Sequence, residues 1–502
     1  MCAQLLCALP TRRTPTARHG LGHQPFGISY DFEGRTLMQR SAASAPSALR
    51  RNLVRGLLSL LAILAAFGGF LYAKSEHIVL GAEAYVYGYP LVIMDVTRER
   101  SNQNLGPENE LHRVRQFPDS RFKNVVRPNV DTLYTTAFID MAQGPWVFDM
   151  APNSARYELM PFMDAWTNVF ASPGTRTSGT AGGTFLLAGP GWNGAIPAGM
   201  QLLRSPTRMV WLIGRTQTNG ASDFPVVHRL QDGLKLSRLD SAPTPLAEPT
   251  KPVRNHSAND LAPLASMKAM GTQAFFDRLS ALMVDNPPAA ADGPMVMKLA
   301  RIGLVPGQTP QWGWLDRMGV GVGRWIADFK LSQELNKLSD AKRGWSTPPS
   351  ILGQYGTHYN IRAGVAIIGL GANLPADATY PITRGDANGQ SLNGKHRYKL
   401  HFKPGSLPPV NAFWSLTAYG DDDYLIDNPL QRFALGDRDP LVYNPDGSLD
   451  LWIQSSEPTG QPLSNWLPVK PDQTFSLNAR LYWPKSSAVE ATWRMPAVER
   501  LD

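Results

Sequence analysis

Residues 127–168 place many polar side chains between segments that are apolar enough to be core β-strands. Residues 130–141 and 146–150 have this strand-like content, and the turn sequence Gln143-Gly144-Pro145 separates them. The polar and charged residues of the stretch are Arg127, Asn129, Asp131, Thr132, Tyr134, Asp140, Arg156, Tyr157, Asp164 and Asn168. Because Arg and Asp are rarely fully buried without partners, this stretch must contain either a paired network or a wet cleft.

These two alternatives lead to different functions. A buried polar network would fix a single arrangement of a large β core, which is the more common role of such residues. A solvent-connected cleft would instead hold a polar ligand. The stretch alone does not decide between them, so both alternatives stay open.

The charge distribution excludes a nucleic-acid interface. The chain carries a formal net charge of +8, but the first 76 residues contain nine Lys and Arg against three Asp and Glu. The remainder is therefore close to neutral and has no basic stripe. Both cysteines, Cys2 and Cys7, also lie in this leader. The body has no thiol for a disulfide, a metal site or a nucleophile, which suits an oxidising compartment.

An uncharged apolar run, GLLSLLAILAAFGGFLYA, occupies residues 56–73 and follows Arg50, Arg51 and Arg55. Its length is at the lower limit for a membrane-spanning helix and somewhat above that of the apolar h-region of a usual signal peptide. We favour an uncleaved anchor with residues 1–55 as a disordered cytoplasmic leader, because the residues before Ala73 make a poor cleavage site. The upstream arginines predict a cell-membrane protein whose body is exported to the periplasmic side. A cleaved leader would release it as a periplasmic or secreted protein, and translation starting at Met38 would remove both cysteines.

The body is predicted to be mainly β with a helical insert, an α+β protein with two β-sandwich or jelly-roll-like domains. The first domain spans residues 78–242 and begins with two short helices interrupted by Pro90. A linker at 243–252, rich in Pro, Thr and Ala, opens a helical block that extends to residue 370. Residues 371–502 return to strands with a period of two.

The two β regions end in similar patterns, which suggests an internal duplication. In each, a proline precedes an arginine at the end of an apolar strand by nine positions: Pro206 and Arg215, then Pro471 and Arg480. Coincidence in a chain rich in Pro and Trp is the alternative. In the second of these strands the alternation places Arg480 and Tyr482 together on the less apolar face.

The sequence has none of the usual catalytic motifs: no G-x-S-x-G, no H-E-x-x-H, no P-loop and no dinucleotide fingerprint. The histidines are dispersed, so no zinc site is predicted, and Asp421-Asp422-Asp423 fits a solvated loop better than a Ca²⁺ site. Asp131 and Asp164 remain as candidate catalytic acids and bases, or as ligands for a divalent cation such as Mg²⁺. The candidate substrate-binding residues are Arg127, Asn129, Tyr134, Arg156, Tyr157, Arg215, Trp414, Arg480 and Tyr482.

Several motifs resemble a known family. NVDTLYTTAFIDM, ARYELMPFMDAWTNVF, TFLLAGPGW and MVWLIGRT are similar to the N-terminal domain of an exported bacterial two-domain family of unknown function. DATYPITRGDANGQSLNG, AFWSLTAYG, YNPDGSLDLWIQ, NWLPV and FSLNARLYWP are similar to its C-terminal domain, so the resemblance covers about residues 78–501. It implies paired β-sandwich domains with helices between them, outside the cytoplasm, and some relatives have been suggested to hydrolyse phosphorylated small molecules. It supplies no catalytic residues.

Two functional hypotheses follow. The first is a hydrolase that acts on an anionic small molecule, such as a phosphorylated one, with Arg127, Arg156 and Arg480 as anion clamps. The second is a non-catalytic envelope protein that binds a ligand or has a structural role. Both expect a small-molecule ligand, a membrane contact through the N-terminal helix and no nucleic acid, and both are compatible with a homo-oligomer.

Overall fold

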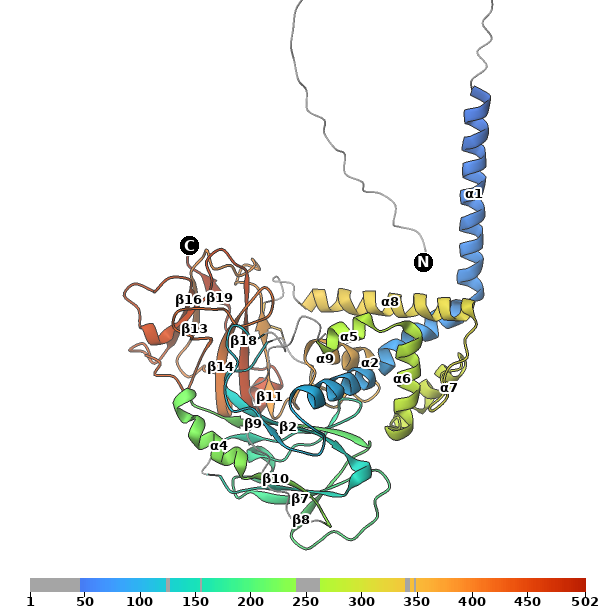
Figure 1. The fold of residues 1–502 in the computed structure, drawn as a ribbon. Helices are drawn as coiled ribbons and strands as arrows, with labels where there is room; N and C mark the ends of the chain where they lie inside the picture. The colour runs from blue at the N-terminus through green and yellow to red at the C-terminus, as the bar shows by residue number, and fades with distance from the viewer. Residues whose placement is uncertain (1–45, 123–126, 154–155, 241–261, 339–343, 347–348) are drawn as a thin grey trace, which may run out of the picture. The chain divides into compact units, whose positions relative to one another are not determined.

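The computed structural model describes residues 46–122, 127–153, 156–240, 262–338, 344–346 and 349–502 (Figure 1). The chain divides into two compact units, Met1–Ala66 and Phe67–Asp502. The leader before residue 46, including the alternative start at Met38, and the linker predicted at 243–252 lie outside the described residues. The larger unit contains every sheet described below.

Two helices are long and apolar enough to cross a membrane, by length and composition only. Helix α1 (Pro46–Ala73) contains the first candidate span, residues 50–73, of which none is buried. Helix α2 (Ser75–Asn104) contains the second, whose most apolar window is 67% buried inside the protein. Of these two helices, α2 is therefore a core helix, and α1 is the one whose candidate span is not buried.

The prediction of two short helices before residue 98 is wrong, because α2 continues through Pro90 as one helix of 30 residues. A proline inside a helix costs about 3 kcal/mol. In α2 this cost is offset by the burial of large apolar side chains on both sides of the proline. They include Tyr87, Leu91, Val92, Ile93 and Met94, each at most 1% exposed.

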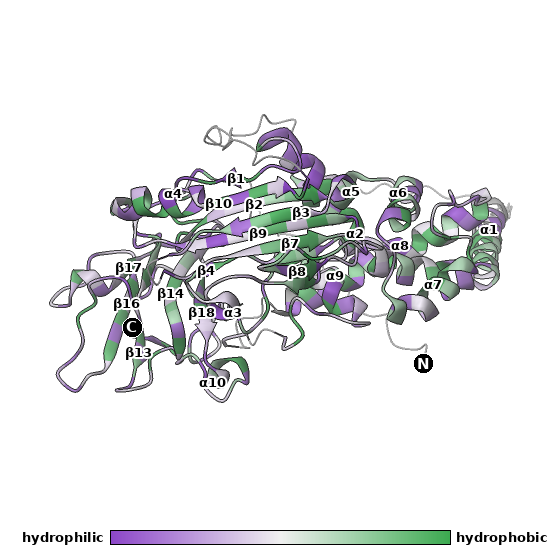
Figure 2. Ribbon diagram, turned by 90° about the horizontal axis from the view of Figure 1, so that it is seen from below, coloured by the Kyte–Doolittle hydropathy of each residue, from purple (hydrophilic) through white to green (hydrophobic). Residues whose placement is uncertain are grey.

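The N-terminal half contains two sheets that share one hydrophobic core. The six-stranded sheet consists of β1 (His112–Arg113), β2 (Thr132–Asp140), β9 (Met209–Gln217), β5 (Phe162–Asp164) and β6 (Val169–Ala171), with β4 (Glu158–Leu159) also paired to β9. The four-stranded sheet consists of β10 (Leu234–Arg238), β3 (Trp146–Met150), β7 (Gly183–Ala188) and β8 (Met200–Arg204). Figure 2 shows hydrophobic residues running along these strands.

Helices cover the other face of the six-stranded sheet. The helical layer consists of α2, α5 (Pro263–Ala269), α6 (Thr272–Asp285), α7 (Gly293–Ala300), α8 (Trp314–Leu338) and α9 (Tyr359–Ile368). Its core includes Phe138 of β2, Met163 of β5 and Met209 of β9, which shows that sheet and helices pack together. The helical block is thus joined to the N-terminal half through α2. Short helices elsewhere are α3 (Thr175–Ser178), α4 (Phe224–Asp232), α10 (Ser486–Val489), η1 (Met141–Gln143), η2 (Ala221–Asp223), η3 (Ala290–Asp292) and η5 (Leu463–Asn465).

The C-terminal half again has two sheets around one core. The five-stranded sheet consists of β11 (Ala378–Thr379), β18 (Phe475–Pro484), β14 (Val410–Gly420) and β15 (Ala434–Gly436), with β12 (Ile382–Thr383) also paired to β18. The four-stranded sheet consists of β17 (Trp466–Pro468), β16 (Leu449–Gln454), β13 (Tyr398–Phe402) and β19 (Val498–Arg500). The alternation predicted for β18 is confirmed: Phe475, Leu477, Ala479 and Leu481 all face the shared core.

Four strands of each sheet follow the same order in both halves. In the larger sheets these strands are β2-β9-β5-β6, with β1 added beside β2, and β11-β18-β14-β15. The smaller sheets read β10-β3-β7-β8 and β19-β13-β16-β17. In each smaller sheet the last pair is parallel, whereas every other pair in these orders is antiparallel. Arg215 on β9 and Arg480 on β18 therefore lie on corresponding strands.

Candidate functional site

The segment before β2, residues 127–131, lies on the outer face of the C-terminal five-stranded sheet. The Arg127 amide donates to the Asp423 carbonyl over 2.8 Å, and Arg480 Nη2 donates to the Arg127 carbonyl over 3.1 Å. The Tyr419 hydroxyl donates to the Pro128 carbonyl over 2.7 Å. We call this contact between residues 127–131 and strands β14 and β18 the seam.

Asp131 is sealed within the seam. Its Oδ2 accepts a hydrogen bond of 2.6 Å from Ser415, its Oδ1 is paired with Arg438, and the residue is 1% exposed. Asn129 is close by, with its Nδ2 donating to the Tyr482 hydroxyl over 2.8 Å and its Oδ1 accepting from the Asp131 amide over 2.7 Å. At this end, the polar groups form a closed network.

The other end of the seam holds more positive than negative charge. Arg127 Nη2 and Arg384 Nη2 both donate to Asp423 Oδ1, over 2.6 and 2.7 Å. Arg480 donates instead to neutral groups, the Tyr419 hydroxyl over 2.6 Å and Thr417 Oγ1 over 2.7 Å. Two guanidiniums thus share the Asp423 carboxylate, and the charge of a third, Arg480, acts on Arg127.

Arg127 is the strained member of this cluster. Its φ of 52° and that of Asp423, 60°, lie in the left-handed region that non-glycine residues seldom adopt. Its Nη1 is buried without a hydrogen-bond partner. Burial lowers the pKa of Arg127, and the charges of Arg384 and Arg480 lower it further, while Asp423 opposes them. An additional anion would relieve both the unpaired donor and the repulsion.

Arg215 forms a second buried cation near the seam. Its Nη1 donates to Asn373 Oδ1 over 2.8 Å and its Nη2 donates to the Gly371 carbonyl over 3.0 Å. The guanidinium lies 5.1 Å from the ring centre of Tyr134, and its Nε is buried without a partner. The Tyr134 hydroxyl accepts a long hydrogen bond of 3.3 Å from Asn129 Nδ2, which connects this cation to the seam.

Aromatic side chains form the apolar part of the same contact. Tyr157, Phe413 and Tyr482 pack in one small cluster, with the Phe413 and Tyr482 rings stacked at 4.2 Å. The Tyr157 hydroxyl donates to the Asp377 carbonyl over 2.9 Å. Trp414, a predicted substrate-binding residue, points the other way into the C-terminal core and packs against Phe402.

Two further candidates do not contact residues 127–131. Arg156 forms a bidentate pair with Asp223 and donates to the Gln217 carbonyl over 3.4 Å, beside Thr132. Asp164 lies opposite Val210 on β9, whereas the residue after Asp131, Thr132, lies opposite Gln217. Seven strand positions separate those partners, which is about 23 Å. Asp131 and Asp164 therefore do not share a site.

Asp164 serves a local structural role. Its Oδ1 accepts the amides of Trp166 over 2.9 Å and Asn168 over 2.8 Å, which closes the turn after β5. Burial raises the pKa of its carboxyl to about 6. Across the described part of the chain, no group of three or more His, Cys, Asp and Glu is arranged to hold a metal ion.

Three residues that contact the seam aspartates were not among the sequence-based candidates. They are Arg384, which donates to Asp423, and Ser415 and Arg438, which donate to Asp131. The alternating polar face of β14, which contains Ser415, Thr417 and Tyr419, was the available signal. It did not show which segment covers that face.

Comparisons with known proteins agree on the two-part organisation. Residues 108–238 match the family described as "Protein of unknown function (DUF1254)", and residues 377–486 match "Protein of unknown function (DUF1214)". No curated protein has significant sequence similarity to this chain.

One crystal structure has a similar fold, and a second matches more weakly. The VPA0106 protein from Vibrio parahaemolyticus is 24% identical with a TM-score of 0.64, and the match covers 85% of this chain and all of that one. An uncharacterised protein from Burkholderia cenocepacia is 12% identical with a TM-score of 0.42, over 88% of this chain and 96% of that one. The chain thus contains a DUF1254 match in its N-terminal half and a DUF1214 match in its C-terminal half, which is consistent with a two-domain family of unknown function.

Proposed function

We propose that the protein binds a small anion, a carboxylate or phosphate group, at the seam through Arg127 and Arg384. The observation that carries this proposal is that Arg127 and Arg384 share one carboxylate, Asp423, while the charge of Arg480 also acts on Arg127. Buried cations are normally paired, so an excess of guanidinium groups favours an anionic partner.

The geometry suits recognition by a guanidinium fork. The side chains of Arg127 and Arg384 are 15% and 23% exposed, so an anion can approach their exposed atoms from solvent. Arg127 Nη1 is itself buried and has no hydrogen-bond partner among the described residues. Charge-assisted hydrogen bonds of this kind are about twice as strong as neutral ones, and a partly buried site strengthens them further. In this proposal Arg480 does not contact the anion, but its positive charge acts at the same site through its proximity to Arg127.

Binding without turnover is better supported than hydrolysis. A general base must reach the proton that it removes. Both carboxylate oxygens of Asp131 are engaged, by Arg438 and Ser415, and Asp164 lies at the opposite end of β9. The second hypothesis of the sequence analysis, a non-catalytic ligand-binding protein, therefore fits the seam better than a hydrolase does.

The anchor and the duplication extend this proposal. We infer that α1 anchors the body at the membrane with the body exported, since three arginines precede its apolar run. We also infer that the halves are β-sandwiches related by duplication, on the basis of their common strand order. An ancestral single domain would then have acquired the seam when its two copies packed together.

Calorimetry with the full chain tests the binding proposal. Titration with a panel of small carboxylates and phosphates should find a ligand whose affinity falls at least about tenfold in Arg384→Gln, given the strength of charged hydrogen bonds. Arg397→Gln is the matched control, because Arg397 pairs with Asp502 and is 57% exposed elsewhere on the C-terminal half. Equal affinity in both variants would contradict the proposal. Turnover in a phosphatase and esterase panel, with and without Mg²⁺, that Asp131→Asn abolishes would support the hydrolase instead.

A further inference from the structure

Helix α8 exposes a stripe of large apolar side chains. The exposed fractions are 71% for Trp314, 36% for Leu315, 50% for Met318, 66% for Trp325 and 53% for Phe329. Trp314, Met318, Trp325 and Phe329 are spaced by four, seven and four positions, which places them on one face of the helix. This face is not needed for the fold.

The opposite face of α8 packs against the core. Val320, Ala327 and Leu331 are buried there, and Gly323 lies so close to α2 that an added Cβ would come within 2.1 Å of the Ile78 carbonyl oxygen. The orientation of the helix is thus fixed by packing, and the aromatic stripe must face outward. Within it the rings of Trp325 and Phe329 stack at 5.8 Å. A contiguous apolar patch of this kind usually marks an interaction surface.

The chain itself indicates what this surface meets. The candidate membrane span ends at Ala73, and the next residue, Lys74, forms a 2.5 Å ion pair with Asp316 in the first turn of α8. A Cβ added to Gly319 would lie 3.2 Å from the Cβ of Lys74. The start of α8 is therefore in direct contact with the residue that follows the span, and Figure 1 shows the start of α8 beside the start of α2.

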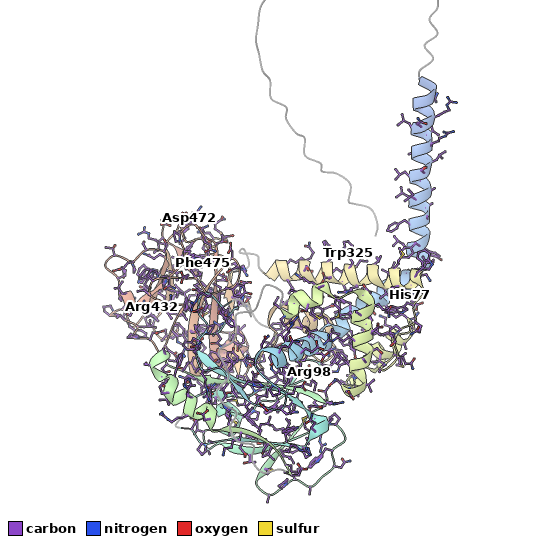
Figure 3. The ribbon with its side chains drawn as sticks, viewed as in Figure 1. His77, Arg98, Trp325, Arg432, Asp472 and Phe475 are labelled. Atoms are coloured by element: carbon purple, nitrogen blue, oxygen red, sulfur yellow. The ribbon has the colours of Figure 1, made fainter. Side chains whose placement is uncertain are left out.

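We propose that the aromatic face of α8 lies in the headgroup region of the lipid bilayer that α1 enters. Trp residues concentrate at this depth because their rings are apolar and their N–H groups are polar. Tyr72, which is 86% exposed near the end of the span, is a further aromatic residue suited to this depth. Figure 3 places Trp325 on α8, part-way along the helix. From Trp314 to Phe329 the stripe extends over about 22 Å of helix.

This contact gives the anchor a second point of attachment. A single span leaves a body free to rotate about its tether, whereas an interfacial helix holds one face against the bilayer. The inference rests on α1 as a membrane anchor and is independent of the ligand at the seam. It assigns the lipid surface, and not a second protein, as the partner of α8.

Site-directed spin labelling of the full chain tests the proposal. Cys2→Ser and Cys7→Ser leave no other cysteine, so single cysteines can be introduced at Trp325, at Phe329 and at Val442. Val442 is the matched control, because it is an apolar residue that is 50% exposed on the C-terminal half. Each labelled chain is incorporated into phospholipid nanodiscs, and collisions with oxygen and with a water-soluble nickel chelate are measured.

Labels at 325 and 329 should collide several-fold more with oxygen, relative to nickel, than the label at 442, because oxygen concentrates in lipid. Equal ratios at all three positions would overturn the proposal, since they would place α8 in water. Low collision rates with both reagents at 325 and 329 would also overturn it, since a protein partner would then cover the stripe. The collision rates at positions 325 and 329 are measured in separate variants, so the test remains possible if one of them does not fold.

Discussion

The carboxylate of Asp131 accepts a 2.6 Å hydrogen bond from Ser415, a residue 284 positions later in the chain. This bond connects the segment before β2 with β14 of the C-terminal half. Because Arg438 pairs with the same carboxylate, Asp131 is held by two groups from the C-terminal half. The two halves are thus joined by buried polar contacts as well as by aromatic packing.

Replacing Asp131 with Asn should strongly destabilise the protein. The substitution leaves the Arg438 guanidinium, 17% exposed, with only its longer 3.9 Å ionic contact to Asp437, and breaking a buried pair costs up to about 3–5 kcal/mol. Urea unfolding measures the change. Asp119→Asn is the control, since its partner Arg121 is 85% exposed, and it should change stability by less than about 0.5 kcal/mol. Similar small changes in both variants would show that the Asp131 pair does not hold the halves together.

A double-mutant cycle should detect coupling across the seam. Asn129 Nδ2 donates to the Tyr482 hydroxyl over 2.8 Å in a buried setting. Asn129→Ala and Tyr482→Phe should each destabilise the protein, and the double variant should lose less than their sum by about 0.5–2 kcal/mol. Strict additivity would mean that this hydrogen bond is absent in solution.

Two glycines of α8 should respond in opposite directions to alanine. Gly323→Ala would place a Cβ 2.1 Å from the Ile78 carbonyl oxygen and force α2 and α8 apart, which should cost about 1–3 kcal/mol. Gly321→Ala meets nothing nearer than Thr272 Oγ1 at 3.8 Å, so helix propensity should stabilise it by about 0.5–1 kcal/mol. Thermal unfolding distinguishes the two, and equal midpoints would contradict the close packing of these helices.

Asp164 should make stability fall as pH rises from about 4 to about 6. Burial raises its pKa from 3.8 to about 6, so in this range the folded protein binds a proton that the unfolded chain has released. Below this range the carboxyl is protonated in both states, and above it burial penalises the ionised form in the folded state alone. Asp164→Asn removes the titration.

The stability difference between wild type and Asp164→Asn should therefore shift by about 2–3 kcal/mol in favour of the variant between pH 4 and pH 7. Urea unfolding at both pH values measures this difference. A difference that stays constant with pH would show that the pKa of Asp164 is close to its ordinary value.

Local sequence patterns predicted where strands occur better than they predicted which segments pack against one another. The alternation in residues 475–483 specified both the strand β18 and its polar face, because side chains of a strand point to opposite sides in turn. Pro90 led to the wrong prediction of two helices, since helix propensity does not include the burial that keeps α2 continuous.

The seam could not be predicted from the sequence, because it consists of contacts between segments that lie far apart in the chain. Arg127 and Asp131 were identified as unusual, but their partners Asp423, Ser415 and Arg438 come from the distant C-terminal half. The sequence around Asp131 and that around Asp164 have the same strand-like pattern, so both residues were given the same catalytic role. Their placement near opposite ends of β9 follows from strand register, which a single sequence does not reveal.

The most direct test of an anion site at the seam is a crystal of the protein soaked in selenate, with anomalous diffraction recorded at the selenium edge. The account predicts an anomalous peak within hydrogen-bond distance of the Arg384 guanidinium and beside the guanidinium of Arg127. This peak should be absent from crystals of Arg384→Gln grown and soaked in the same way. Ordered selenate elsewhere on the wild-type protein, with none at the seam, would contradict the account.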